Sequence, residues 1–259
     1  MELEEFKLDN QEIGEEISHF LKKEFQERGK NKAILAVSGG IDSALCAYLV
    51  KKAGLDLYAV VLPYGDKGGD GEKLAKELGL AEDHIFTIDI SSAVDRIIED
   101  LEKIIKVDKV DKGNIMARQR MVVQYTLARS LDGLVIGTEN LSEYYLGYFT
   151  LYGDQACDIA PISGIFKTQV YDLARYLGVP EYILSKKPSA DLWEGQTDEK
   201  ELGFNYEDAD PILYFLKVKN YSKEEIIKKG FDSNLVNSVL ERVKATEFKR
   251  QNSPRCIIN

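Results

Sequence analysis

The sequence predicts an α/β fold in which a parallel sheet is covered by helices on both faces, because short apolar runs alternate with helical segments. The first apolar run, at 33–37, leads directly into a Ser-Gly-Gly loop and then a helical segment. The same alternation recurs further along the chain. Ligands of such sheets bind at the carboxyl ends of the strands, where the strand order reverses. We therefore expect the functional site at the edge that carries the glycine loop.

Each segment supports this fold in turn. Residues 12–28 place apolar side chains at helical spacing with Glu and Lys between them, which predicts an amphipathic helix. The elements expected next are strand 33–37, helix 44–54, strand 57–63, helix 71–79, strand 84–90, helix 91–105, helix 115–131 and strand 134–137. After about residue 190 the chain is polar and acidic without a clear period, which predicts a mobile loop suited to a lid. Short helices are expected over 207–247.

Length and composition are typical of a globular protein. The chain has 259 residues, 44% of them hydrophobic and 30% charged, and we expect one domain over 1–259. A formal net charge of -10 opposes non-specific binding to nucleic acid or to an anionic membrane, so neither is an expected partner. The N-terminal stretch lacks a signal-peptide pattern, and no apolar run approaches about 20 residues. We expect a cytoplasmic location.

Cysteines and histidines give no sign of a catalytic or metal centre. Cys46, Cys157 and Cys256 lie far apart without a C-x-x-C pair, which argues against a disulfide framework and a structural zinc site. His19 and His84 are the only histidines, and we expect structural roles for both. A Ser-His-Asp hydrolase would need one of them.

The loop Ser38, Gly39, Gly40, Ile41, Asp42, Ser43 suits a phosphate. A strand that passes through two glycines into a helix presents backbone N–H groups and the positive end of the helix to one point. Asp42 could hold a magnesium ion bound to the phosphates, or it could simply cap the helix within a tight turn. Neither G-x-x-x-x-G-K-[ST] nor a G-x-G-x-x-G after a strand occurs. These absences point to a different nucleotide chemistry.

The chain resembles a known family at this loop and beyond it. SGGxDS is similar to the loop of the ATP pyrophosphatases, which adenylate a substrate. The further segments that carry the resemblance are LPYG (62–65), KGNIMARQRM (112–121), GTENLSE (137–143), GYFTLYGDQACD (147–158), PISGIFKTQV (161–170), KPSADLWEGQTDEKELG (187–203) and TEFKRQ (246–251). Together they resemble the ammonia-dependent NAD synthetases. This resemblance implies a Rossmann-like doubly wound sheet of the adenine nucleotide α-hydrolase type.

The resemblance also implies a reaction. The nicotinate carboxylate of deamido-NAD would attack the α-phosphate of ATP, and ammonia would then displace AMP to give NAD. Magnesium would be the cofactor, and a homodimer would form the dinucleotide site at the subunit interface. Because the sequence shows no amidohydrolase region, we expect ammonia that is free or delivered by a separate subunit. The resemblance leaves two alternatives: another ATP pyrophosphatase with a different substrate, and a non-enzymatic ATP-binding sensor.

Site residues follow from positions in these motifs. The ATP-binding residues would be Ala36, Val37, Ser38, Gly39, Gly40, Ile41, Asp42, Ser43, Thr138, Lys167 and Ser189. Deamido-NAD would contact Arg118, Leu151, Asp158, Phe248 and Lys249. Asp42 and Glu143 would hold magnesium, and Lys167 and Asp42 would be catalytic.

Taken without the resemblance, these residues say less. Glu143 alone would be a solvated helix carboxylate, and Arg118 could either extend from a packed surface or enter a cleft. Cys157 lies within a motif, but Asp154 and Asp158 would raise the pKa of its thiol, so we expect it to pack.

Three positions depart from the family pattern. Leu151 stands where the family has lysine, and Phe248 where it has histidine. Both positions belong to the dinucleotide contacts, so ATP activation is the safer expectation. Ser189 replaces threonine but keeps the hydroxyl group.

Overall fold

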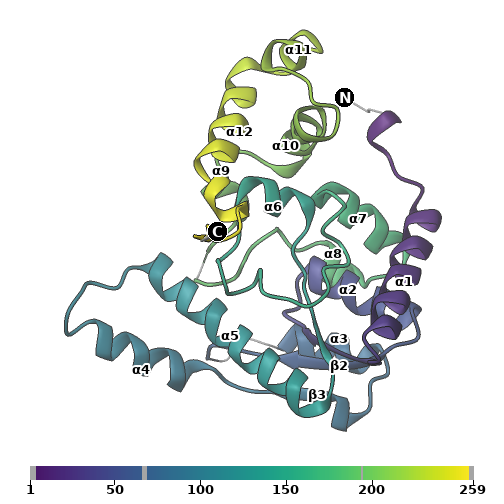
Figure 1. Ribbon diagram of the computed structural model, residues 1–259, viewed down its shortest axis with the longest axis vertical. Coiled ribbons are helices and arrows are strands. Elements are labelled where there is room, and N and C mark those ends of the chain that lie inside the picture. The colour runs from purple at the N-terminus through teal and green to yellow at the C-terminus, as the bar shows by residue number, and fades with distance from the viewer. Residues whose placement is uncertain (1–3, 66–68, 194, 257–259) are drawn as a thin grey trace.

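The computed structural model describes residues 4–65, 69–193 and 195–256, and Figure 1 shows their arrangement. Its sheet consists of β1 (Lys32–Ala36), β2 (Asp56–Val61), β3 (Ile85–Thr87) and β4 (Leu134–Ile136). These strands lie in the order β3-β2-β1-β4, and every neighbouring pair is parallel. The strand order reverses at β1, so the carboxyl ends of β1 and β4 flank the switch point. The predicted fold class is confirmed.

Helices follow most of the strands. Those of the first two thirds of the chain are α1 (Asn10–Glu27), α2 (Ile41–Lys52), α3 (Gly69–Glu77), α4 (Ser91–Leu101), α5 (Lys109–Leu131), α6 (Leu141–Leu146) and α7 (Lys167–Tyr176). The later ones are α8 (Glu181–Leu184), α9 (Asp198–Leu202), α10 (Tyr206–Leu213), α11 (Lys223–Lys228) and α12 (Ser233–Ala245). A π-helical turn, η3, covers Tyr214–Val218, and single 3-10 turns cover Glu4–Phe6 (η1), Glu82–His84 (η2) and Glu247–Arg250 (η4).

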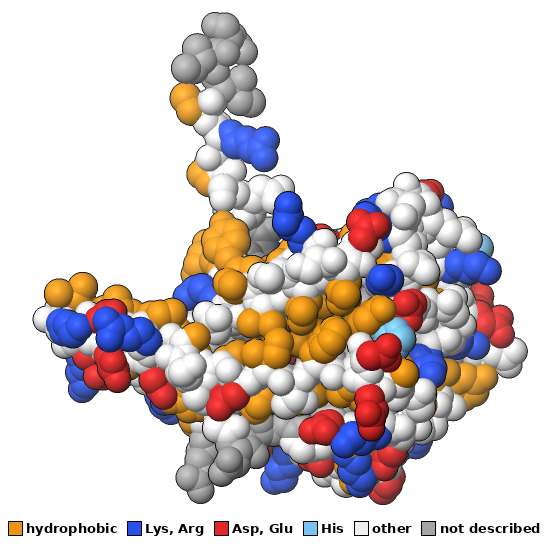
Figure 2. Space-filling view, turned by 90° about the horizontal axis from the view of Figure 1, so that it is seen from below, with side chains coloured by type: hydrophobic (Ala, Val, Ile, Leu, Met, Phe, Trp, Pro, Cys, Tyr) orange, Lys and Arg blue, Asp and Glu red, His pale blue; other side chains and the backbone are white. Residues whose placement is uncertain are grey.

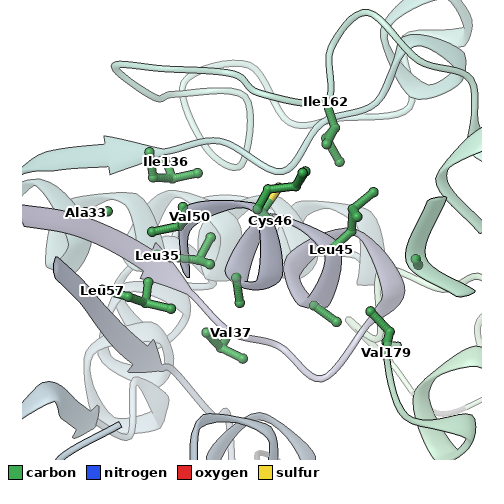
Figure 3. Packing of buried hydrophobic residues seen from close by; sticks show 14 of the residues in the cluster. Ala33, Leu35, Val37, Leu45, Cys46, Val50, Leu57, Ile136, Ile162 and Val179 are labelled. Atoms are coloured by element: carbon green, nitrogen blue, oxygen red, sulfur yellow. The ribbon is translucent and has the colours of Figure 1, made fainter. Parts of the chain in front are cut away.

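Side-chain alternation along β1 divides the core between the two faces of the sheet. Ala33 and Leu35 belong to a cluster with residues of α1, α2 and α7. Figure 3 shows part of this cluster, with both residues beside side chains of α2. Ile34, between them, points to the opposite face and packs with residues of α4 and α5. Successive side chains of a strand point to opposite faces, so a strand that is apolar throughout must be covered on both sides. This is why the run 33–37 reads as continuously apolar.

The C-terminal helices pack together above the sheet in the view of Figure 1. Their apolar faces meet those of α6 in a separate cluster that includes Leu146, Ile212 and Val239. The predicted short helices over 207–247 are thus present. Within the described residues, no helix combines the length and apolarity needed to cross a membrane. A single domain over 1–259 stays a prediction.

Several element boundaries differ from those predicted. The third strand spans only Ile85–Thr87 rather than 84–90, because Asp89 accepts a hydrogen bond from the Ser91 backbone N–H at 2.8 Å and turns the chain into α4. Helix α4 ends at Leu101 and not at 105. Helix α5 starts at Lys109, six residues early, because Asp108 forms a capping box there. The polar residues that cap a helix do not follow its hydrophobic periodicity, so a prediction based on that periodicity started the helix too late.

Candidate active site

A cavity of about 1030 Å³ opens at the carboxyl ends of β1, β2 and β4. The predicted ATP-binding residues all line it: Ala36, Val37, Ser38, Gly39, Gly40, Ile41, Asp42, Ser43, Thr138, Lys167 and Ser189. The two predicted magnesium ligands, Asp42 and Glu143, line it as well. Segments from four separate parts of the chain therefore converge on the expected edge of the sheet.

The glycine loop is held by hydroxyl groups and by close backbone packing. The Ser43 hydroxyl donates to the Gly40 carbonyl at 3.0 Å, and the Gly40 N–H donates to the Ser38 hydroxyl at 3.2 Å. Gly39 has φ +80°, and a Cβ there would lie 2.7 Å from Asp70 Cβ. Gly40 is the N-cap of α2, so the alternative interpretation of Asp42 as a helix cap is wrong. Asp42 instead lies in the first turn of α2.

Gly71 of α3 packs against the glycine loop so closely that alanine should not fit. A Cβ at Gly71 would lie 2.1 Å from the Val37 carbonyl oxygen. We expect Gly71→Ala to lower the free energy of unfolding by about 1–3 kcal/mol, because backbone must move to make room. Gly69→Ala, two residues earlier with nothing within 4 Å of its added Cβ, is the matched control and should be neutral or stabilising. Urea denaturation of both variants measures the difference, and equal stabilities would contradict this packing.

Lys167, Asp42 and Glu143 form an ion cluster in the cavity wall. The Lys167 ammonium nitrogen lies 2.5 Å from Asp42 Oδ2 and 3.0 Å from Glu143 Oε1. The exposed fraction of the Lys167 side chain is 3%, against 18% for Asp42 and 15% for Glu143. A burial this deep strengthens the Coulomb attraction between these charges relative to surface ion pairs, while their desolvation offsets part of that gain.

Two polar networks fix the positions of these side chains. Asn140 caps α6 in a capping box with Glu143, and its side-chain amide donates to Asp42 Oδ1 at 2.8 Å. The start of α7 is held by Asp210, a fully buried carboxylate that accepts from the Thr168 N–H at 2.9 Å. Lys167 is the first residue of α7, so Asp210 sets the point from which the lysine side chain extends.

Charge and burial shift the acid–base behaviour of the cluster. Burial raises the pKa of Glu143, the Lys167 ammonium opposes this rise, and Asp42 adds to it. Burial alone would lower the pKa of Lys167, but the nearby Asp42 and Glu143 outweigh that effect and raise it. The lysine therefore stays protonated.

The residues present fit a magnesium ion. Mg²⁺ is commonly bound through one or two carboxylates together with phosphate oxygens and water, and Asp42 and Glu143 offer that donor set. Within the described part of the chain, no group of three or more His, Cys, Asp or Glu side chains is arranged to hold a metal on its own. The site thus suits a cation that arrives with a phosphate ligand.

Comparison with known proteins agrees with this geometry. The model of the family described as NAD synthase matches residues 13–253. The chain belongs to the NAD synthase family. The predicted family is thereby confirmed, and with it the prediction of an enzyme of the ligase class.

Other NAD synthase family members align with nearly the whole length of this chain. It is 40% identical to the NH(3)-dependent NAD(+) synthetase of Fusobacterium nucleatum, over 94% of this chain and 95% of that one. It is 42% identical to the enzyme of the same name from Pyrococcus horikoshii, over 94% and 93%. Among solved structures, it is similar to the NMN synthetase from Francisella tularensis, with a TM-score of 0.84, 32% identity and coverage of 97% and 100%. The NH3-dependent NAD synthetase from Campylobacter jejuni gives 0.80 and 30%, with coverage of 97% and 100%.

The residues predicted to bind deamido-NAD lie outside the cavity. Among its lining residues are none of Arg118, Leu151, Asp158, Phe248 and Lys249. Arg118 is exposed, and its Nε donates to the Leu151 carbonyl at 3.2 Å. The Lys249 ammonium donates to the carbonyls of Gly147 and Phe149, and Asp158 accepts from the Val135 N–H at 2.8 Å. Phe248 is 62% exposed. Their role in substrate binding stays a prediction.

Sequence reasoning missed the face of α5 that does line the cavity. Lys112, Met116, Arg120 and Gln124 recur every four residues and all lie in its wall. Arg120 donates from Nε to the Leu62 carbonyl at 3.1 Å, and Lys112 donates to the Tyr64 hydroxyl at 2.6 Å. The four-residue spacing was the available signal, because such residues share one helix face. Arg118, in the same motif, points the other way.

Cys157 and His84 are partly buried, and the structural roles expected for Cys157 and for both histidines stay predictions. The pKa of the Cys157 thiol is raised to about 11, chiefly by burial and then by Glu139 and Asp158. The predicted direction is confirmed, with Asp158 as one of its causes, while the contribution expected from Asp154 stays a prediction. His84 lies beside Tyr58 at a ring distance of 4.3 Å, and neither it nor His19 lines the cavity.

The segment after residue 190, predicted as a mobile loop, contains helix α9, which Thr197 caps through a hydrogen bond from the Lys200 N–H. Leu192, Trp193 and Gln196 of this segment line the cavity. The Ser189 hydroxyl donates to the Gln196 carbonyl at 2.9 Å. The segment thus closes one side of the cavity, while its mobility stays a prediction.

Proposed function

We propose that this chain amidates deamido-NAD with ammonia in an ATP-dependent reaction that yields NAD, AMP and pyrophosphate. The observation that carries this proposal is the buried Lys167 cluster with Asp42 and Glu143 beside the glycine loop. A non-enzymatic ATP sensor would have no use for a buried lysine between two carboxylates, which favours an enzyme. The names of the relatives support the substrate.

The chemistry requires activation of an unreactive carboxylate. An oxygen of the nicotinate carboxylate attacks the α-phosphorus of ATP, and pyrophosphate leaves with the electrons of the broken P–O bond. Ammonia then attacks the acyl carbon, AMP leaves, and a proton is released from nitrogen. The chain contributes mainly positioning and charge stabilisation. The glycine loop Ser38 to Ser43 would hold the phosphates, with Thr138 and Ser189 as further ATP contacts.

Lys167 would stabilise negative charge on the transferring and departing phosphates, since its ammonium group is buried in the wall of the same cavity. Asp42 and Glu143 would hold Mg²⁺, which when bound neutralises phosphate oxygens. Arg118, Leu151, Asp158, Phe248 and Lys249 would contact the dinucleotide outside this cavity.

A nicotinate mononucleotide is the second candidate substrate. One of the similar structures is an NMN synthetase, and two of the three departures from the family pattern, Leu151 and Phe248, fall on the predicted dinucleotide contacts. An apolar side chain at either position cannot form the ion pair that lysine or protonated histidine offers to an anionic substrate. The activation chemistry is the same for both substrates.

Product formation from each substrate tests the proposal. The chain is incubated with magnesium, ATP and ammonium plus either deamido-NAD or the nicotinate mononucleotide, while pyrophosphate and amide product are measured. We expect both products with deamido-NAD, at a kcat/KM above that of the mononucleotide. The reverse preference would select the second candidate, and no product from either would contradict the proposal.

We also propose a cytoplasmic homodimer. Exposed apolar side chains on the α4–α5 arm support the dimer: Ile97, Ile104, Ile105, Val110 and Val122. Figure 2 shows hydrophobic side chains along the projecting arm and on the face seen from below. Arg118 lies on the same helix, so a partner there would complete the predicted dinucleotide contacts. Sedimentation as a monomer at micromolar concentration would contradict the dimer.

A further inference from the structure

Asp198 is a buried carboxylate in the cavity wall to which the reaction above gives no role. The residue is 2% exposed, and its Oδ2 accepts a hydrogen bond from the Tyr206 hydroxyl at 2.9 Å. Its Oδ1 is also buried, and within the described residues it has no hydrogen-bond partner. Leaving a buried polar atom unpaired costs about 1–3 kcal/mol, and more when the group is charged. The oxygen therefore indicates that a donor reaches it in another state of the site.

The Lys167 ammonium group is the cationic donor near this carboxylate, whereas the nearby Tyr148 hydroxyl already donates to Glu201 at 2.9 Å. After Asp42 and Glu143, Asp198 is the carboxylate whose charge acts most strongly on Lys167. Tyr206 links the two residues: the ammonium nitrogen lies 5.5 Å from the centre of its ring, while its hydroxyl donates to Asp198. A lysine carries a compact charge on a flexible four-carbon stem, so a short swing can exchange one carboxylate for another.

A divalent cation would compete directly with this lysine. All four carboxylate oxygens of Asp42 and Glu143 are already engaged, two by the Lys167 ammonium and two by Asn140. A magnesium ion that takes the two oxygens facing Lys167 must displace the ammonium group, because the two cations repel at contact distance. Asp198 lines the same wall, and its buried Oδ1 has no hydrogen-bond partner within the described residues.

We infer that Asp198 is a positioning residue that accepts the Lys167 ammonium group when a magnesium–ATP complex takes the oxygens of Asp42 and Glu143. The inference rests on the proposed function, since it requires a metal-bound nucleotide in this cavity. It explains how Lys167 stays beside the phosphates instead of leaving the site.

The position of Asp198 also couples this exchange to the segment that closes the cavity. Asp198 donates from its backbone N–H to the Pro188 carbonyl at 3.0 Å, directly before Ser189. It is the first residue of α9, at the end of the cavity-lining segment. An ion pair between Lys167 and Asp198 would thus connect the lysine to the segment that contains Ser189.

A double-mutant cycle on nucleotide binding tests this inference without turnover. The probe is the magnesium complex of α,β-methylene-ATP, a non-cleavable analogue, and calorimetry gives its dissociation constant. We expect Asp198→Asn to weaken binding about tenfold in the wild-type background and less than about twofold in a Lys167→Met background. Asp198→Glu, which keeps the charge, should recover part of the loss.

Tyr206→Phe is the matched control, because it removes the hydrogen bond to Oδ2 but leaves the carboxylate. We expect it to weaken binding less than about threefold. Equal effects of Asp198→Asn in both backgrounds, or a Tyr206→Phe effect as large as that of Asp198→Asn, would overturn the inference. A wild-type chain that fails to bind the analogue would overturn the proposed function as well. The failure of the inference alone is thus distinguishable from the failure of the proposed function.

Discussion

Replacing Lys167 with methionine is expected to lower turnover by about 10³-fold. The ammonium group is the buried cation of the cavity cluster, 2.5 Å from Asp42 and 3.0 Å from Glu143, and methionine keeps most of the apolar stem. Removing one preorganised charge from a site where phosphate charge develops costs about 10²–10³-fold, and a buried ammonium lies at the upper end. Steady-state release of pyrophosphate measures the loss.

The same variant has a signature in stability. Without the lysine, two carboxylates face each other in a buried wall, and breaking such a pair costs about 3–5 kcal/mol. We expect magnesium to raise the melting temperature of Lys167→Met more than that of the wild type, because the metal replaces the missing cation. Lys76→Met, an exposed lysine paired with Glu72 on α3, is the control and should change neither turnover nor the effect of magnesium. Near-normal turnover of Lys167→Met would remove the lysine from the mechanism.

Asp42→Asn should raise the magnesium concentration needed for half-maximal rate by about 10–100-fold. Asparagine keeps the size of the side chain and an oxygen that can accept from Asn140, so the geometry of the first turn of α2 is preserved. What is lost is the negative charge, which is the main source of affinity for a hard divalent cation. Initial rates over a magnesium titration at saturating ATP give the value.

Asp172→Asn provides the matched control for this substitution. It also removes one acidic charge, but Asp172 is exposed and pairs with Arg175 on the outer side of α7. We expect its magnesium dependence to equal that of the wild type. If Asp42→Asn titrates like Asp172→Asn, Asp42 does not hold the metal.

The ATP side of the site could be predicted from sequence because its parts are local. The run from Ser38 to Ser43 is a contiguous loop whose glycines and helix start determine its geometry, and Thr138 follows another strand of the same sheet. In a parallel sheet the carboxyl ends of neighbouring strands converge, so sequence order already places these segments together. Glu143 and Lys167 came from the family resemblance and not from their own surroundings.

Features that depend on tertiary packing could not be predicted. The burial of Asp198 depends on Tyr206 and on the path of the segment before it, which has no periodic pattern. Whether Arg118 or Arg120 faces the cavity depends on the rotation of α5 about its own axis against the sheet. The predicted start of this helix was six residues late, so the sequence could not determine that rotation. Contacts to a second subunit also could not be predicted from the sequence of one chain.

Exchange of labelled pyrophosphate into ATP, with magnesium and deamido-NAD but without ammonia, tests the central claim most directly. The claim is that the Lys167 cluster and the glycine loop form an adenylation site, and this exchange reports the reversal of adenylation alone. We predict exchange that depends on deamido-NAD and is lost in Lys167→Met. Exchange that proceeds without any carboxylate substrate, or its complete absence from a chain that binds ATP, would contradict the account.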